Sequence, residues 1–416
     1  MKNFLCVLLA SFATMAFATG LKQNGSEIDA RLTFATQQLD KLRSMAITQK
    51  DIPRSTNPDG SIHWITGSDE WKNNAKLGVP FDWTEGFFPG TCWYLYEYTK
   101  ENKWKECAQE LMTIYRSHSE KKGTHDLGFV FQPSYGKGFK LTGDKDYKAC
   151  LIEASNVLVK RFYPAAGCIK SWDEDKDWQK AHGWTCPVII DNMINLEMLF
   201  ETSLLTGDSI YAKVAMAHAN ATMKNHYRPD MSCCHVVDYD TVSGKVISKV
   251  TAQGYSNSSS WARGQAWGLY GFTMCYRYTK NVNYLNQSKK IASFILKNKN
   301  LPADKIPYWD FSSPDIPKTY RDASAAAIIA SALIELDEYA PEMNYLKIAK
   351  EMMNNLSSSK YLAVKNGNKN FLLMHNVGSI PHMLEVDVPI NYSDYYYVEA
   401  LMRLKTRESK EVSSKK

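Results

Sequence analysis

Apolar residues recur along this chain with the spacing of amphipathic helices, and the helical stretches come in pairs. Each pair is joined by a short polar turn, and an aromatic residue follows the turn. Five turns of this kind occur, at residues 99–104, 142–147, 206–211, 279–284 and 340–345. Repetition at this length is typical of stacked helical hairpins. The pattern therefore predicts an all-α fold.

The first and last helical stretches, at about 27–45 and 391–405, form a sixth pair only if they meet in space. Six hairpins closed head to tail make an (α/α)6 barrel, in which apolar inner helices are surrounded by more polar outer helices. We expect one such catalytic domain over residues 19–405. The predicted inner helices are residues 83–98, 128–141, 189–205, 261–279, 320–339 and 392–404.

Long and dissimilar loops precede several inner helices, at about 54–82, 168–187, 229–260 and 301–318. The third loop has a Thr-Val-Ser-Gly turn between valine-containing runs, which predicts a β-hairpin. Long loops on one face of a protein usually build a pocket. We therefore expect an active site at the end of the barrel where the inner helices begin, and where their free N–H groups favour anions.

The two ends of the chain differ from the barrel in composition. Residues 1–18 combine a lysine, an apolar run and a small-residue ending, which is the pattern of a secretory signal peptide and predicts a periplasmic protein. Residues 406–416 are highly charged and are expected to form a disordered tail. No other segment is apolar for long enough to suggest a membrane span.

The composition of this chain of 416 residues indicates which classes of ligand and partner to expect. The net charge is +6, with cations scattered along the sequence, which does not suggest nucleic acid but suits a small anionic substrate. None of the nine cysteines belongs to a Cys-x-x-Cys pair, so a structural zinc site is not expected. We expect no metal, no cofactor and a monomeric protein, and the sequence leaves open whether the adjacent Cys233 and Cys234 each pair elsewhere in an oxidising compartment.

Two aspartates are the strongest candidates for chemistry. Asp126 and Asp191 each stand beside an apolar stretch near the start of a predicted inner helix, and Asp191 follows a Pro-Val-Ile-Ile run. Two carboxylates are the minimum requirement for acid/base catalysis on a sugar, and an apolar setting raises the pKa of a general acid. The structural alternative is that each aspartate caps its helix.

Aromatic and cationic residues accumulate near the same helix starts, at Trp83, Trp172, Trp261, Arg263 and Trp267. Such groups suit flat, anionic carbohydrate rings, which favours an enzyme that acts on an acidic sugar. The structural alternatives are tryptophans that fill the core, and an arginine that merely stacks on the tryptophan four residues further along the same helix.

Several separate motifs together resemble a known family. They are DWTEGFFPG at 82–90, HDLGF at 125–129, IIDNMINL at 189–196, SWARGQAW at 260–267, PYWDF at 307–311, RDAS at 321–324 and EVDVP at 385–389. Through these motifs the chain resembles the unsaturated glucuronyl hydrolases of glycoside hydrolase family 88 over nearly its whole length beyond the leader. The resemblance implies the (α/α)6 barrel as well.

The resemblance also implies a reaction. These enzymes release a 4,5-unsaturated hexuronate from the non-reducing end of oligosaccharides left by polysaccharide lyases, by hydrating the C4=C5 vinyl ether so that the resulting hemiketal opens. Asp191 then corresponds to the general acid/base and Asp126 to the second carboxylate, which contacts ring hydroxyls. The residues implied in substrate binding are Trp83, His125, Trp172, His235, Gln253, Trp261, Arg263 and Trp267.

Two other functions stay open on the sequence alone. The related unsaturated rhamnogalacturonyl hydrolases act on pectin fragments with similar chemistry, although the HDLGF and SWARGQAW segments favour the glucuronyl hydrolases. A non-catalytic periplasmic sugar-binding protein is the third possibility, but a mere binder has no need for a carboxylate in an apolar site, where it is costly.

The loop at residues 376–384 is expected to reach over the subsite for the second sugar. Ser379 and His382 would there donate hydrogen bonds to a sulfate or hydroxyl group, and Lys245, Lys249 and Arg321 are expected near the same mouth. The structural alternative is that Ser379 sits in a turn and His382 is solvated.

Overall fold

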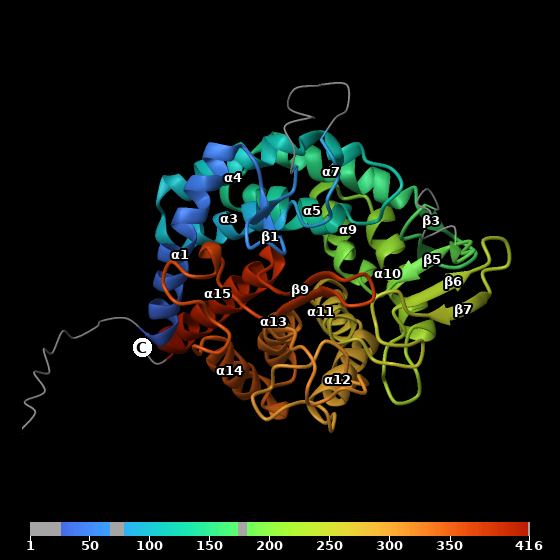
Figure 1. The fold of residues 1–416 in the computed structure, drawn as a ribbon. Coiled ribbons are helices and arrows are strands. Elements are labelled where there is room, and N and C mark those ends of the chain that lie inside the picture. Colours follow the sequence, from blue (N-terminus) through green and yellow to red (C-terminus); the bar gives the residue numbers. More distant parts are fainter. Residues whose placement is uncertain (1–25, 67–78, 174–180, 415–416) are drawn as a thin grey trace, which may run out of the picture.

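The computed structural model describes residues 26–66, 79–173 and 181–414, and its helices form two concentric rings (Figure 1). The inner ring consists of α3 (Phe87–Thr99), α5 (Leu127–Phe131) with η2 (Gln132–Gly136) and α6 (Lys137–Thr142), α9 (Asn192–Thr206), α11 (Ala262–Thr279), α13 (Ala323–Tyr339) and α15 (Asn391–Ser414). The outer ring consists of α1 (Glu27–Gln49), α4 (Asn102–Ile114), α7 (Lys145–Val159), α10 (Ile210–Asn225), α12 (Val282–Leu296) and α14 (Tyr345–Leu356).

The ring closes where the two ends of the chain meet. Helix α15 packs against α13 on one side and against α3 and α1 on the other, so the first and last helices form the sixth pair. The predicted (α/α)6 barrel is thereby confirmed, and its core lies between and within the rings.

Burial explains which helices are inner. Nearly every side chain of α13, including the alanine-rich run that begins at Ala323, is buried, because small residues allow neighbours on all sides. The outer α14 instead buries one stripe, at Tyr345, Ala349, Met352, Met353 and Leu356. Two hairpin turns end their first helix at glycines with positive φ, Gly143 at 72° and Gly207 at 76°.

Short strands occupy the loops rather than the rings. They are β1 (Pro53–Thr56), β2 (Ile62–Trp64), β3 (Phe162–Tyr163), β4 (Cys168–Ile169), β5 (Pro187–Ile189), β6 (Val236–Tyr239), β7 (Val246–Val250), β8 (Asn376–Ser379) and β9 (Leu384–Val388). The β6–β7 pair is the predicted hairpin, and β5 extends it into a three-stranded antiparallel sheet with Val188 opposite Val237. Single turns η1 (Arg116–Glu120), η3 (Pro341–Met343) and η4 (Asn368–Asn370) complete the chain.

Some predicted boundaries are wrong. The helix expected at 128–141 is interrupted by the wider turn η2, whose Pro133 has no N–H to donate. Helix α15 continues to Ser414, so the prediction of a disordered tail is wrong for residues 406–414. The charges of this segment have partners, since Arg407 lies 2.7 Å from the carboxylate of Asp337.

Other predictions concern the ends and the cysteines. The predicted signal peptide, residues 1–18, lies outside the described residues. Within the described part of the chain, no helix is long and apolar enough to cross a membrane. All eight cysteines there are buried free thiols.

Candidate active site

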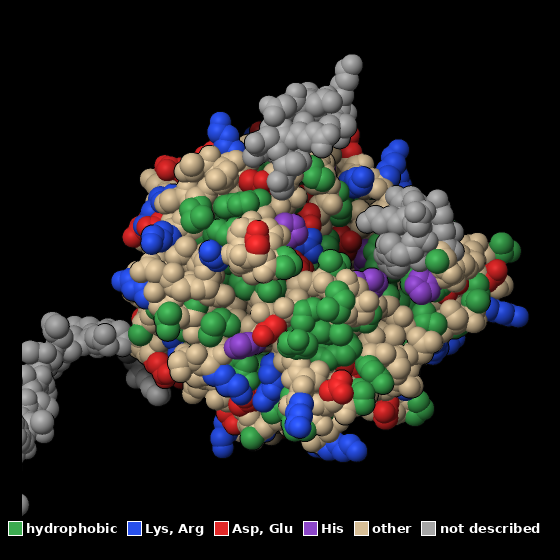
Figure 2. All heavy atoms as spheres, viewed as in Figure 1, with side chains coloured by type: hydrophobic (Ala, Val, Ile, Leu, Met, Phe, Trp, Pro, Cys, Tyr) green, Lys and Arg blue, Asp and Glu red, His purple; other side chains and the backbone are tan. Residues whose placement is uncertain are grey.

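A cavity of about 530 Å³ opens at the end of the barrel where inner helices begin. Its walls come from β1, the segment before α3, the starts of α5 and α9, and the β8–β9 hairpin. Figure 2 shows charged and histidine side chains gathered at the hollow near the centre of this face. The volume lies within the range of pockets that hold small ligands. Six of the ten residues predicted for catalysis or for binding the unsaturated sugar line it: Trp83, Asp126, Trp172, Asp191, Gln253 and Arg263.

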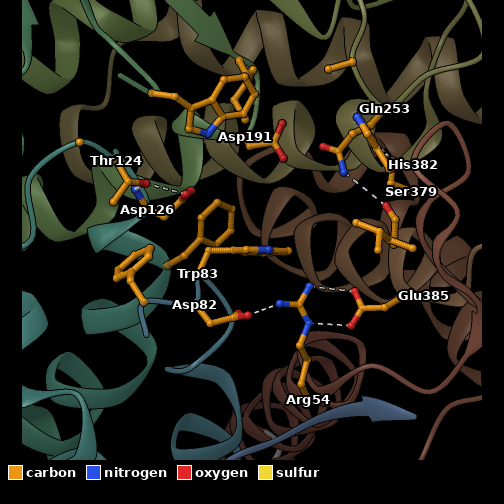
Figure 3. A pocket seen from close by; sticks show the side chains of 18 of the residues that line it. Arg54, Asp82, Trp83, Thr124, Asp126, Asp191, Gln253, Ser379, His382 and Glu385 are labelled. Atoms are coloured by element: carbon orange, nitrogen blue, oxygen red, sulfur yellow. Dashed lines mark hydrogen bonds and ion pairs between the residues drawn. The ribbon is translucent and has the colours of Figure 1, made fainter. Parts of the chain in front are cut away.

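Neither aspartate caps its helix. Asp126 directly precedes α5 and Asp191 directly precedes α9, yet neither side chain accepts a hydrogen bond from the following turn. Asp322 at the start of α13 does so, accepting from the N–H groups of Ser324 and Ala325. The capping interpretation is therefore wrong for Asp126 and Asp191, and both carboxylates are directed toward the cavity (Figure 3).

The charge of Asp126 is set by burial. Burial raises the pKa of this carboxyl group, while His125 and the hydroxyl of Thr124, which donates at 2.8 Å, oppose the shift. Among the described residues, neither Asp126 nor Asp191 forms an ion pair with lysine or arginine. Such a site can hold and exchange a proton, which a carboxylate locked to an arginine does poorly.

A histidine lies behind each aspartate. His125 is fully enclosed, with Nε2 3.2 Å from Asp126 Oδ1 and Nδ1 3.4 Å from the side-chain nitrogen of Asn195. Burial lowers the pKa of His125, which favours the neutral ring. His235 Nε2 lies 3.5 Å from Asp191 Oδ2. Both predicted histidines therefore contact a candidate catalytic carboxylate and do not line the cavity themselves.

Two predicted aromatic residues form cavity walls. Trp83 packs against Phe129 and Tyr392, with ring centroids 5.2 and 5.1 Å apart, and Trp172 stacks on Trp184 at 6.1 Å. These neighbours hold the ring planes, and both indoles line the cavity. Because the rings are held in place, a sugar can pack on them with little ordering of side chains.

The other two tryptophans do not line the cavity, so the prediction that they complete the pocket is wrong. Trp267 is fully buried between Phe129 and Tyr396, in the core of the barrel. Trp261 packs on the ring of His235, with centroids 4.8 Å apart. The alternative in which tryptophans fill the core therefore holds for Trp267.

Arg263 is mainly a structural residue, although one part of it reaches the cavity. Its guanidinium donates to the main-chain carbonyls of Val377 and Gly378 and lies 3.3 Å from Asp322. It stacks over Trp261 at 4.6 Å, not on Trp267 as the alternative proposed. Arg263 thus attaches the β8–β9 hairpin to the barrel.

Several cavity residues were missed by the sequence analysis. Arg54 lies between Asp82 and Glu385, 2.6 Å from the latter, and Lys121 and Lys122 form part of the rim. The pairing of Arg54 with Glu385 joins opposite ends of the chain, so no local pattern indicates it. Asp82 and Glu385 are the first residues of the DWTEGFFPG and EVDVP motifs, and membership of these motifs was the signal that could have indicated them.

The predicted loop does reach the cavity. Ser379 and His382, on the β8–β9 hairpin, both line it, and the Ser379 hydroxyl lies 2.7 Å from His382 Nδ1. Lys245, Lys249 and Arg321, which were expected near the mouth, do not line the cavity, and Arg321 is bound to Asp304. In the described part of the chain, no three His, Cys, Asp or Glu side chains are grouped to hold a metal ion.

Two carboxylates between aromatic walls, at the mouth of an (α/α)6 barrel, define a glycoside hydrolase. The sequence profile of Glycosyl Hydrolase Family 88 matches residues 55–406, and the chain belongs to that family.

Known relatives agree with this assignment. The chain is 46% identical over 403 residues to an unsaturated glucuronyl hydrolase of Formosa agariphila, covering 95% of this chain and 96% of the relative. It is 33% identical to an unsaturated chondroitin disaccharide hydrolase of Streptococcus agalactiae, covering 80% and 84%. The crystal structure of an unsaturated glucuronyl hydrolase specific for heparin superimposes with a TM-score of 0.84 at 41% identity, covering 92% and 98%.

Proposed function

We propose that this enzyme hydrolyses oligosaccharides that carry a 4,5-unsaturated hexuronate at the non-reducing end. The observation that carries the proposal is the pair of cavity carboxylates, Asp126 and Asp191, neither of which is held by a cation in the described residues. The names of the relatives, which refer to unsaturated glucuronyl groups and chondroitin disaccharides, support the substrate class.

In the proposed reaction Asp191 is the general acid/base. Its carboxyl group gives a proton to C4 of the vinyl ether, and the positive charge that develops at C5 is shared with the ring oxygen. Water then adds to C5 and returns its proton to the Asp191 carboxylate. The resulting hemiketal opens and releases the remaining sugar, so the carboxyl group ends the cycle as it began.

The other cavity residues would hold the ring. Trp83 and Trp172 offer faces for stacking, and Gln253, whose amide nitrogen donates to Gly378 O at 3.3 Å, reaches the cavity from the opposite wall. Asp126 would accept hydrogen bonds from ring hydroxyls. A substrate that is itself anionic favours the protonated form of nearby carboxyl groups, which assists the first step.

A panel of lyase-generated unsaturated disaccharides tests the proposal. We expect loss of the ultraviolet absorbance of the C=C bond with glucuronyl substrates, and we expect Asp126→Asn and Asp191→Asn to prevent it. Turnover of unsaturated rhamnogalacturonan fragments alone would favour the pectin alternative. Saturable binding without loss of absorbance would favour the sugar-binding alternative.

We also propose that the β8–β9 hairpin reads the second sugar. Ser379 and His382 lie together at the cavity and offer hydrogen-bond donors to a sulfate or hydroxyl group there. We expect Ser379→Ala and His382→Ala to change the ratio of kcat/KM for sulfated and unsulfated disaccharides. An unchanged ratio would mean that this hairpin does not contact the second sugar.

The cellular setting is part of the same proposal. The leader at residues 1–18 would direct the chain across the inner membrane into the periplasm, where it would act as a monomer. We expect the mature protein to begin near Thr19, which N-terminal sequencing of the periplasmic fraction would show. Sedimentation of the purified enzyme would test the monomer.

A further inference from the structure

His235 and Asp191 are brought together by the main chain. His235 directly precedes β6, and Asp191 follows Ile190 at the end of β5. The two strands are paired with Ile189 opposite Val236, and the N–H of Ile190 donates to the carbonyl of His235 at 3.0 Å. The separation of the two side chains is therefore fixed by strand register.

The hydrogen on the His235 ring is also fixed by the main chain. Its Nδ1 accepts from the backbone N–H groups of Ala252 and Gln253, at 3.0 and 3.2 Å. A backbone N–H can only donate, so Nδ1 must carry a lone pair. The hydrogen of the neutral ring is then on Nε2, and a second proton would have to enter against two donors.

The Nε2–H group faces a carboxylate oxygen that needs a donor. His235 Nε2 and Asp191 Oδ2 are both enclosed, 3.5 Å apart, and neither has another hydrogen-bond partner in the described residues. A buried donor and a buried acceptor that stay unpaired are costly, so each is the partner of the other. Asp191 itself lines the cavity, which leaves Oδ1 as the oxygen that faces it.

The surroundings hold the ring in this orientation. Trp261 packs against His235 at 60° between ring planes, and Arg263 covers Trp261. His226 and His382 interact electrostatically with His235, and Asp191 lies 3.5 Å from its Nε2. In the described part of the chain, Asp191 is the only carboxylate within 4.0 Å of a His235 ring nitrogen, so it is the acceptor for the Nε2–H.

We propose that His235 is a positioning residue that donates from Nε2 to Asp191 Oδ2, so that the catalytic proton of Asp191 resides on Oδ1. A proton on Oδ2 would oppose the Nε2–H, whereas Oδ1 can deliver a proton to C4 and recover one from water. The inference rests on the proposed role of Asp191, and it gives His235 a task other than the substrate contact expected from the sequence.

The tautomer can be observed without measuring activity. Long-range proton–nitrogen correlation spectra of the intact enzyme with isotope-labelled histidine distinguish the two ring nitrogens, and His235→Gln identifies the signal. We expect the ring hydrogen on Nε2 and a lone pair on Nδ1, because Nδ1 accepts from two backbone N–H groups. His218, whose Nδ1 also accepts a backbone N–H, at 3.0 Å from Ile169, serves as the reference for such a ring. A hydrogen on Nδ1 would overturn the proposal.

Kinetics separate positioning from substrate binding. His235→Phe keeps a ring without a donor, and we expect kcat to fall by on the order of a hundredfold with KM little changed. His235→Gln keeps a neutral donor, so it should retain more kcat than the phenylalanine variant and show the wild-type pH profile. His218→Phe, which removes another buried imidazole, controls for loss of stability.

Two outcomes would contradict the inference. A rise in KM as the main effect of His235→Phe would make His235 a substrate contact, and loss of one limb of the pH profile in His235→Gln would make it an acid or base. Should Asp191→Asn stay active, the proposed role of Asp191 fails, whereas the spectra still decide the tautomer.

Discussion

Buried carboxylates at the two ends of the inner ring have opposite surroundings. At the mouth, Asp126 and Asp191 face histidines, and burial raises the pKa of Asp126. Toward the other end, Glu335 on α13 is bound by two arginines, with Arg277 Nε 2.7 Å away and Arg403 on its second oxygen. Burial alone would raise the pKa of Glu335, but Arg277 and Arg403 bring it well below its usual range.

The comparison separates two uses of a buried charge. Glu335 is held as an anion by cations that cannot leave, which fixes helices α11, α13 and α15 relative to one another. In the described residues, the aspartates at the mouth form no ion pair with lysine or arginine, which lets their charge change during a reaction. Substitutions that remove one carboxylate at each end therefore test the contrast directly.

The largest effect is expected at Asp191. Replacement by asparagine keeps the shape of the side chain but removes the exchangeable proton, so kcat should fall by ~10²- to ~10⁴-fold. Because the side chain does not cap α9, the unfolding temperature should stay near that of the wild type. Activity within a few-fold of wild type would remove Asp191 from the mechanism.

Glu335→Gln should have the opposite effects, with a loss of stability and no change in kcat. It leaves Arg277 and Arg403 without a shared anion, which costs about 3–5 kcal/mol in the free energy of unfolding. The kcat of the folded fraction should be unchanged. Chemical denaturation measures the loss, and Glu338→Gln, on the same helix but 37% exposed, is the matched control. Equal losses in the two variants would argue against a special role for burial.

Aromatic substitutions give a smaller effect. Trp83→Ala and Trp172→Ala should weaken substrate binding by roughly 1–3 kcal/mol through lost stacking. The measurement is KM, or the dissociation constant in an Asp191→Asn background. Trp267→Phe is the control, because this buried ring should affect stability rather than KM. Unchanged binding in both alanine variants would assign Trp83 and Trp172 to the core.

The smallest effect concerns stability and pH. The pKa of Asp126 is above its ordinary value of 3.8, so its ionisation destabilises the fold as the pH rises through and above that value. Asp126→Asn lacks this penalty, and its melting temperature relative to wild type should increase with pH. Glu335, whose pKa is lowered, contributes stability that is lost as the pH falls below the ordinary glutamate range, so Glu335→Gln should be least harmful in acid.

Sequence patterns predicted what depends on local periodicity. The hairpin turns, the ring and the position of Asp126 and Asp191 at helix starts all follow from spacing along the chain. The surroundings of Trp267 and Arg263 were harder to predict. Nearly every residue of their inner helix is buried, so the sequence does not reveal which side faces the cavity and which faces a neighbouring helix. The contact of Arg54 with Glu385 depends on closure of the ring, and no local pattern encodes it.

The attachment of the β8–β9 hairpin has an evolutionary consequence. Arg263 binds the carbonyls of Val377 and Gly378 at the end of one strand, and Arg54 binds Glu385 near the start of the other. Both strands of the hairpin are therefore held in place, and the tip between Ser379 and Leu384 can change in sequence without moving them. Under the proposal that this hairpin reads the second sugar, mutations there would alter which substrates are accepted while Asp126 and Asp191 stay in place, so new specificities need not be acquired at the expense of catalysis.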